Sequence, residues 1–365
     1  MSTKPEGLSL CMIARNEEGC IQDCLDSVKG IVDEMIVVDT GSDDRTIKIA
    51  EACGASVVSF AWNGSFADAR NIGISHATGE WVLYLDADET VDVQHRSTLR
   101  EVLHSQKWLG SVQVVNYYGA SPPVPHRSNR IAQYRLFRNH PALRFQNPIH
   151  EQLSPGFGLT DQDIVTLPVT VHHYGYLDDI VCSKRKSERN LQLIRSVCTE
   201  EGHDPWFDYH LGSELYRVGN YGEAMDCINT AIIGFLSKNR LPPSLLYRLK
   251  YLLFIETGNY AKAWPNIENA IRLYPDYVDL QLYKGIILLN LKQYEPAIQA
   301  FYRCLELGEH NVTHLTATGS GSFQAWYYIG CCHKQLGMLM EAQKAFDMAQ
   351  KLLTDQNMAT QGFNL

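Results

Sequence analysis

Long apolar runs and an excess of basic residues are both missing from this 365-residue chain. No apolar stretch approaches the ~18 residues that a membrane-spanning helix needs. Residues 1–7 lead into the first apolar segment without the hydrophobic region of a signal peptide, so we expect a cytoplasmic protein. A net charge of -9 argues against a nucleic-acid-binding surface, which is normally basic. We therefore expect no transmembrane segment and no nucleic-acid partner.

Zinc-binding cysteine motifs and glycine-rich phosphate loops are missing too. The ten cysteines are scattered, and neither Cys20 with Cys24 nor Cys331 with Cys332 has the C-x₂-C spacing of a zinc site. This distribution predicts reduced, mostly buried thiols. Neither G-x-G-x-x-G nor G-x-x-x-x-G-K-S/T occurs, which argues against the common dinucleotide and P-loop sites.

The first ninety residues instead alternate short apolar runs with helical patterns. This rhythm predicts βαβ units and a largely parallel sheet, in which ligands bind beyond the carboxyl ends of the strands. Polar clusters follow three of the predicted strands, at 15–18, 39–44 and 86–89. The predicted strands are 8–14, 35–38, 55–60 and 81–85, and the predicted helices are 20–28, 46–52 and 66–75.

The most informative of these segments is Glu80–Glu89, in which an apolar run ends in three acidic residues. We expect a buried central strand there. Residues two apart on extended backbone point the same way, so Asp86 and Asp88 can face one ligand. Mg²⁺ and Mn²⁺ commonly bind one or two carboxylates together with substrate phosphates. An acidic turn after a strand is the simpler alternative.

Beyond residue 90 the pattern is mixed. A helix is predicted at 98–105, strands at 111–118, 131–137 and 165–174, and a loop at 119–130. A long charged helix is predicted over 176–198. Its basic residues, candidates for contact with anionic lipid, are Lys184, Arg185, Lys186 and Arg189.

From Trp206 onward the pattern is that of helical hairpins without strands, built on four alanines that share their surroundings. Each has a large apolar residue four positions later and a small residue seven positions later; three have a glycine twelve positions earlier, which Tyr251 replaces in the second unit. This resembles the tetratricopeptide repeat, whose period is about 34 residues. The alanine spacings are 39, 34 and 45, so two junctions carry insertions. The alanines are Ala224, Ala263, Ala297 and Ala342.

Residues 8–176 resemble a family 2 glycosyltransferase of the GT-A fold. The resemblance lies in four blocks, which are 10–18, 36–46, 68–73 and 85–89. It implies an α/β fold: a GT-A nucleotide-sugar-binding domain with a mixed, mainly parallel sheet and flanking helices, followed by an all-α domain of tetratricopeptide-like repeats. The expected division is 1–176 for the transferase domain, 177–204 for a connecting helix and 205–365 for the repeats.

The resemblance also implies a role for each strand-end residue. Asp88 would bind the cation, and Asp86 would reach the ribose or the metal. The simpler alternatives are that Asp39, Ser42 or Asp44 caps the following helix and that Arg70 is a surface residue. The residues expected to bind the nucleotide sugar are Ala14, Arg15, Glu17, Asp39, Ser42, Arg70, Asp86 and Ala87.

Two later blocks, Tyr134–Arg138 with Asn147–Glu151 and His172–Tyr176, match an apparent subgroup of the family. An inverting transfer needs a general base, for which Glu151 is the candidate and Asp178 and Asp179 are the reserves. His173 is expected as a further metal ligand, or else as a structural histidine beside Tyr174. Arg135 and Arg138 are read either as neutralising diphosphate or as solvated charges at a strand edge.

Together these features predict a metal-dependent, inverting transferase that moves a hexose from a UDP-sugar with Mn²⁺ or Mg²⁺. The layout resembles transferases that glycosylate cysteine or serine of bacteriocin peptides, and a saccharide or lipid-linked acceptor stays open. The repeats would bind the acceptor or form a homodimer. The alternative of another class is a repeat scaffold with a degenerate, non-catalytic domain. A sugar-phosphate nucleotidyltransferase would need a glycine-rich basic loop where Arg15–Glu18 stands.

Overall fold

The computed structural model describes residues 6–180, 186–199 and 202–361. The chain divides into two compact units. The first comprises residues 1–117 and 132–180, and the second comprises 118–131 and 181–365. Residues 118–131, which form the tip of a β-hairpin, therefore belong to the second unit, although the residues on either side belong to the first. The division into domains at 176 and 204 stays a prediction.

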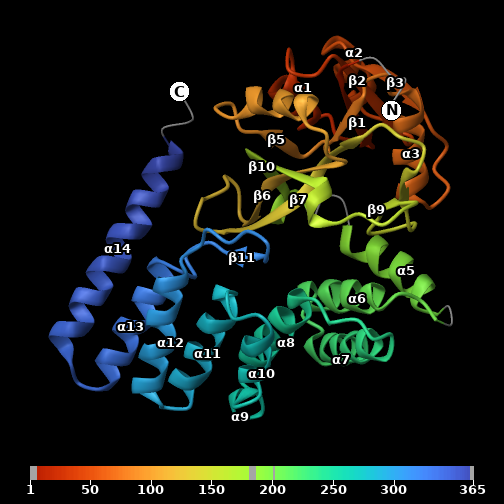
Figure 1. Ribbon diagram of the computed structural model, residues 1–365. Helices are drawn as coiled ribbons and strands as arrows, with labels where there is room; N and C mark the ends of the chain where they lie inside the picture. The colour runs from red at the N-terminus through yellow and green to blue at the C-terminus, as the bar shows by residue number, and fades with distance from the viewer. Residues whose placement is uncertain (1–5, 181–185, 200–201, 362–365) are drawn as a thin grey trace. The chain divides into compact units, whose positions relative to one another are not determined.

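The parallel half of the first unit confirms the predicted βαβ pattern (Figure 1). Its strands pair in the order β3-β2-β1-β4, all parallel, with Ala14 of β1 opposite Asp39 of β2. The apolar strand after Glu80 is central and buried, since Trp81, Val82 and Leu83 are inaccessible to solvent. The elements are β1 (Leu8–Ala14), α1 (Ile21–Val28), β2 (Glu34–Asp39), α2 (Thr46–Ala52), β3 (Ser56–Ser59), α3 (Phe66–His76) and β4 (Trp81–Tyr84).

The other half of the sheet is mixed. It continues from β4 in the order β7-β6-β10-β5, and the β4–β7 and β10–β5 pairs are antiparallel. A separate hairpin pairs β8 with β9. The elements are β5 (Glu89–Val91), η1 (Arg96–His104), β6 (Leu109–Gly119), β7 (Ser128–Arg138), β8 (Leu143–Gln146), β9 (Gln152–Pro155), η2 (Asp161–Asp163) and β10 (Ile164–Leu177).

Two predicted boundaries in this half are wrong. The helix predicted from Tyr176 begins too early, because β10 continues to Leu177, which is buried against Val115 and Tyr117. The described helix is α5 (Lys186–Cys198), and Lys184 and Arg185 lie outside the described residues. The loop predicted at 119–130 ends early, because β7 already begins at Ser128.

The second unit consists mainly of paired helices, as the repeat pattern predicted (Figure 1). One short strand, β11 (Thr316–Ala317), corrects the prediction of helices alone, and it pairs with the hairpin tip at Asn129 and Arg130. No helix among the described residues is long and apolar enough to cross a membrane. The helices are α6 (Pro205–Arg217), α7 (Tyr221–Ser237), α8 (Ser244–Glu256), α9 (Tyr260–Ala263), α10 (Ile267–Leu273), α11 (Val278–Asn290), α12 (Tyr294–Leu307), α13 (Phe323–Gln335) and α14 (Leu339–Gln361).

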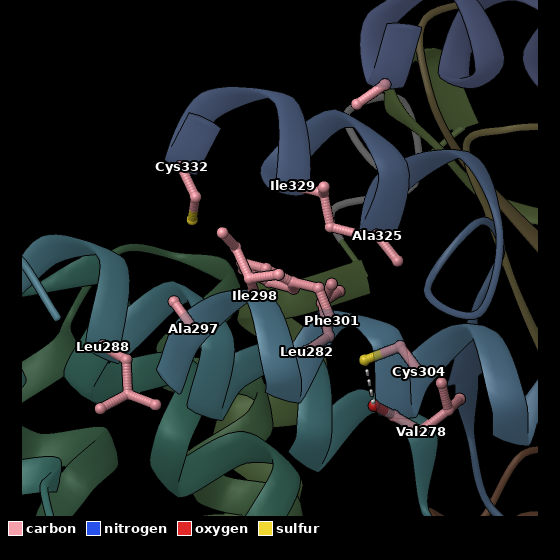
Figure 2. Packing of buried hydrophobic residues seen from close by; sticks show 11 residues of the cluster. Val278, Leu282, Leu288, Ala297, Ile298, Phe301, Cys304, Ala325, Ile329 and Cys332 are labelled. Carbon is pink, nitrogen blue, oxygen red and sulfur yellow. Dashed lines mark hydrogen bonds between the residues drawn. The ribbon is translucent and has the colours of Figure 1, made fainter. Parts of the chain in front are cut away.

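The four repeat alanines are buried, and glycines allow their helices to pack closely. A Cβ on Gly285 would overlap the ring of Phe301, and one on Gly330 would lie 2.6 Å from Phe346 Cε1. Figure 2 shows Ala297, Phe301 and Cys304 of α12 inside this apolar cluster. The second repeat, around Ala263, departs from this arrangement. There Tyr251 takes the place of the glycine, and the partner helix is divided into α9 and α10 near Pro265, which lacks a backbone N–H.

Candidate active site

The polar clusters after β1 and β2 are joined by hydrogen bonds. The backbone N–H of Asn16 donates to Ser42 Oγ over 2.9 Å, and the Asn16 side chain accepts from the backbone of Asp43. The N–H of Glu17 donates to Thr46 Oγ1 over 2.7 Å. Because parallel strands end at one edge, these loops meet as predicted.

Asp39 lies at the end of β2 with 5% of its surface exposed. Its carboxylate accepts from the backbone N–H groups of Gly41 and Ser42, at 3.0 and 3.1 Å. Neither Asp39 nor Ser42 caps α2. The N-cap residue is Arg45, which makes no side-chain capping bond; of the three candidates, Asp44 is the one that contacts the start of the helix, since its Oδ1 accepts from Thr46 N over 2.8 Å. Asp39 is therefore an oriented carboxylate that holds its own loop and retains capacity for another donor.

The other residues predicted around the base lie on the same two loops. Ala14 is buried at the end of β1, and its carbonyl accepts from the backbone N–H of Thr40 over 3.0 Å. Arg15 is exposed. Glu17 is half-buried, and the thiol of Cys20 donates to its Oε2 over 3.1 Å.

Arg70 joins the strand-end carboxylates to a distant segment. Its Nη2 donates to Asp86 Oδ1 over 2.7 Å, and its Nε donates to Glu151 Oε1 over 2.6 Å. The guanidinium is 8% exposed and lies 5.1 Å from the ring centre of Tyr84 and 5.4 Å from that of Phe145. The reading of Arg70 as a surface residue is therefore wrong. Asp86 and Glu151 are 65 residues apart in the sequence, and both bind the guanidinium of Arg70.

The charges at this cluster stabilise one another. Burial alone would lower the pKa of Arg70, but Asp86 and Glu151 raise it above its usual range. Burial would likewise raise the pKa of Asp86, but Arg70 and then Arg135 lower it overall. The pair is therefore ionised at neutral pH.

Contacts made by residues in and next to the block 68–73 fix the position of α3, which carries Arg70. Ser65 caps the helix by accepting from Asp68 N over 3.1 Å. Asn71 connects α3 to β8, because its side chain accepts a hydrogen bond from Phe145 N and donates one to Phe145 O. A Cβ on Gly73 would lie 3.2 Å from Val38 Cγ2, so the helix packs tightly on the sheet.

Asp88 and His173 form a second cluster. His173 Nε2 lies 3.5 Å from Asp88 Oδ1, while its Nδ1 lies 2.8 Å from Asn116 Oδ1, which orients the ring. Burial opposes protonation of His173, but Asp88 and Glu89 raise the pKa of the imidazole overall. A Cβ on Gly175 would lie 2.5 Å from Asp88 Oδ2 and 2.6 Å from His173 Nε2.

Gly175 was missed by the sequence reasoning, although it stands inside the block His172–Tyr176. A side chain at this position would come too close to both Asp88 and His173. A carboxylate and an oriented imidazole are donors that suit Mn²⁺ and similar ions, so these two residues fit a cation. Within the described residues, Asp86 does not converge with them as a third ligand, since its Oδ1 is bound to Arg70.

Two arginines of β7, Arg135 and Arg138, each form an ion pair with a glutamate. Glu89 is completely buried, pairs with Arg135 and accepts from the backbone N–H of Asp86 over 2.9 Å. Arg138 pairs with Glu80. The reading of Arg135 and Arg138 as solvated edge charges is therefore wrong.

Glu151 stands on a loop held against α3. The N–H of Phe66 donates to the carbonyl of Pro148, and Asn147 and His150 have left-handed φ angles of 75° and 51°. The Glu151 side chain is 14% exposed, and its Oε2 accepts no hydrogen bond from the residues that the structure describes.

Asp178 and Asp179, the reserve bases, are exposed just past β10. In the described part of the chain they form no ion pair with the residues of the strand-end site. Glu151, in contrast, shares Arg70 with Asp86.

Comparison with known proteins agrees with these features. Residues 9–164 match the model of glycosyl transferase family 2, and residues 281–310 match that of the tetratricopeptide repeat. The N-terminal domain belongs to glycosyl transferase family 2. The predicted fold class, a GT-A-type α/β domain followed by tetratricopeptide-like helices, is thus confirmed.

Two relatives span both parts of the chain. The chain is 34% identical to a TPR repeat-containing protein of Synechococcus elongatus, over 67% of this chain and 60% of that protein. It is 27% identical to the SPbeta prophage-derived glycosyltransferase SunS of Bacillus subtilis, over 76% of this chain and 66% of that protein. The chain thus spans less than two thirds of the length of these relatives. The solved structure of MamA from Desulfovibrio magneticus matches 49% of this chain and 92% of that one, with 17% identity and a TM-score of 0.40.

Proposed function

We propose that this protein is a metal-dependent, inverting glycosyltransferase that moves a hexose from a UDP-sugar to a peptide acceptor. The observation that carries the proposal is the cluster at Arg70, which holds Asp86 on the donor side and Glu151 in one arrangement. Beside it stand Asp88 and His173. A family 2 domain over residues 9–164 supports the same reading.

The donor would bind at the loops after β1 and β2. The carboxylate of Asp39 suits the N3–H of uracil, and the surrounding loop would be formed by Ala14, Arg15, Glu17 and Ser42. Asp86 is only partly covered, with 36% of its side chain exposed, and can accept from ribose hydroxyls while Arg70 holds its other oxygen. Ala87 would then lie against the nucleotide between Asp86 and Asp88.

The cation would be held by Asp88 and His173. When bound, such an ion neutralises the charge that develops on the departing diphosphate. The protein's own contribution is to fix the donor atoms, since Asn116 orients the His173 ring and Gly175 keeps the space between the two ligands clear.

Glu151 is proposed to take the proton of the attacking acceptor group. Its Oε1 is bound to Arg70, so the carboxylate is fixed in direction, and Oε2 remains to accept the proton. Arg70 acts as a positioning residue between donor and base. Attack opposite the leaving group would invert the anomeric centre, and the proton would pass from the acceptor oxygen or sulfur to Glu151.

A peptide with cysteine or serine is the acceptor we favour, because helical repeats suit extended or helical peptides. The 27% identical relative SunS is a glycosyltransferase by name. A saccharide or lipid-linked acceptor is the second candidate, and homodimerisation is the alternative role of the repeats. We place the protein in the cytoplasm.

Incubation of the full chain with a panel of UDP-sugars and with lysate peptides and small molecules tests this function. We expect mass spectrometry to detect one peptide gaining the mass of a hexose, and gaining less without divalent cation. Transfer to a glycan instead would correct the acceptor. An absence of both transfer and donor hydrolysis across the panel would favour the non-catalytic scaffold.

A further inference from the structure

A cluster of metal-binding side chains lies in the second unit, at the junction of α5 and α6. One ligand atom each from Cys198, His203 and Asp208 lies within 4.8 Å of the others. Cys198 is the last residue of α5, His203 precedes α6, and Asp208 is in the first turn of α6. Thiolate, imidazole and carboxylate are the three protein donors of zinc sites.

The geometry is close to that of a metal site. Ligand atoms around a tetrahedral zinc ion lie roughly 3.3–3.8 Å apart, given metal–ligand bonds of about 2.0–2.3 Å. His203 Nε2 and Asp208 Oδ2 already lie 3.0 Å apart. The side chains of His203 and Asp208 are 20% and 13% exposed, so the site is largely enclosed but open to an ion.

The segment that carries His203 is held in place by residues that follow α7. Lys238 Nζ donates to the carbonyl of His203 over 2.9 Å. Asp204 caps α6 by accepting from Trp206 N over 3.0 Å and also accepts from Arg240 over 2.9 Å. This support fixes the backbone of a candidate ligand before any ion binds.

Two other readings of the cluster are weaker. As a nucleophile Cys198 is poor, because burial and then Asp208 and Cys227 raise the pKa of its thiol to about 11. A role in stabilising the N-terminus of α6 would explain why an acidic residue, Asp208, lies in the first turn of this helix. It would not explain the histidine and the thiol beside Asp208.

We propose that Cys198, His203 and Asp208 bind a zinc-type metal ion that fastens the end of α5 to the first repeat. The fourth position is taken by water or by the thiol of Cys227 on α7. The ion replaces the proton of the Cys198 thiol, which passes to solvent. This site is separate from the one proposed at Asp88, and it stands whether or not the chain is a transferase.

Titration of the metal-stripped full chain with Co²⁺ tests the site, because a thiolate bound to cobalt gives a charge-transfer absorption. We expect this absorption to saturate at one ion per chain, to be removed by Zn²⁺, and to persist in Asp88→Ala. Cys198→Ser should abolish it. Cys20→Ser is the matched control, because Cys20 also lies beside a carboxylate but belongs to no cluster of three metal-binding side chains among the described residues, and it should retain the absorption.

Asp208→Asn provides a second variant that keeps the size of the side chain. We expect it to weaken cobalt and zinc binding about 10–100-fold, the range typical of disturbed metal sites. Zinc should also raise the melting temperature of the wild-type chain but not that of Cys198→Ser. Absence of the thiolate absorption in the wild type, or its persistence in Cys198→Ser, would overturn the proposal.

Discussion

Each unit contains a buried arginine bound to aspartate, and the two pairs differ in how far the aspartate is covered. In the strand-end site, Arg70 holds Asp86, whose side chain is 36% exposed. In the repeats, Arg248 Nε donates over 2.9 Å to Asp279, which is inaccessible. Asp279 also accepts from Ala317 N over 3.1 Å. We propose that the same chemistry serves a ligand in the first unit, whereas it stabilises the fold in the second.

Two glycines repeat this contrast. Gly175 leaves room beside Asp88 and His173, whereas Gly285 leaves room for the ring of Phe301. A methyl group at either position would meet atoms at less than normal contact distance. The neighbours are polar side chains in the first case and an apolar core in the second, so we expect loss of ligand binding from one and loss of stability from the other.

The largest effect is expected from Glu151→Gln. This change keeps the size of the side chain and a hydrogen-bond acceptor for Arg70 but removes the basic oxygen, so transfer should fall about 10²–10⁴-fold. The affinity for UDP and the melting temperature should stay near those of the wild type. Steady-state release of UDP measures the transfer rate, and calorimetry measures the UDP affinity and the melting temperature. Near-normal turnover would indicate that the base is Asp178 or Asp179 instead.

Asp279→Ala should instead lower the free energy of unfolding. It leaves Arg248 buried without its partner, a change that typically costs about 3–5 kcal/mol. Urea denaturation of the full chain measures the loss. Asp276→Ala is the control, because Asp276 is mostly exposed and its contacts with His314 and Asn311 lie at the surface, so its loss should stay below about 1 kcal/mol. Equal losses in the two variants would remove the contrast between the pairs.

Gly285→Ala sharpens the comparison between the glycines. The new methyl group would overlap Phe301, so we expect a loss of about 1–3 kcal/mol in unfolding free energy. Gly222→Ala is the matched control in α7, where nothing lies within 4 Å of the new atom. It should be neutral or stabilising by up to about 1 kcal/mol, because alanine favours the helix. Similar stability of the two variants would contradict the close packing of α11 on α12.

Gly175→Ala should affect cation-dependent donor binding more than stability. The methyl group would occupy the space between Asp88 and His173, and we expect about tenfold weaker UDP binding in the presence of Mn²⁺. Gly158→Ala, which has open space around it, serves as control. Unchanged Mn²⁺-dependent binding in Gly175→Ala would remove this glycine from the site.

Much of this architecture could be predicted from sequence because its signals are local. Parallel strands end at one edge, so the clusters at 15–18 and 39–44 had to meet, and the hydrogen bond from Asn16 to Ser42 shows that they do. The repeat alanines were likewise found by their spacing, and all four of them are buried.

What could not be predicted depends on the direction of side chains and on distant partners. The sequence of the block 68–73 does not predict that the side chain of Arg70 contacts both Asp86 and Glu151. The early start of β7 depends on β11, which lies nearly 190 residues away in the chain. The set Cys198, His203 and Asp208 has no familiar spacing, because its members come from the end of α5, the residues just before α6 and the first turn of α6.

The central claim, a cation-dependent UDP-sugar site at Asp88 and His173, is tested most directly by calorimetric titration of UDP with and without Mn²⁺. We predict that Mn²⁺ strengthens binding at least tenfold in the wild type, and that Asp88→Ala folds normally but loses this gain. UDP binding that is undetectable, or equal with and without the ion in the wild type, would contradict the account.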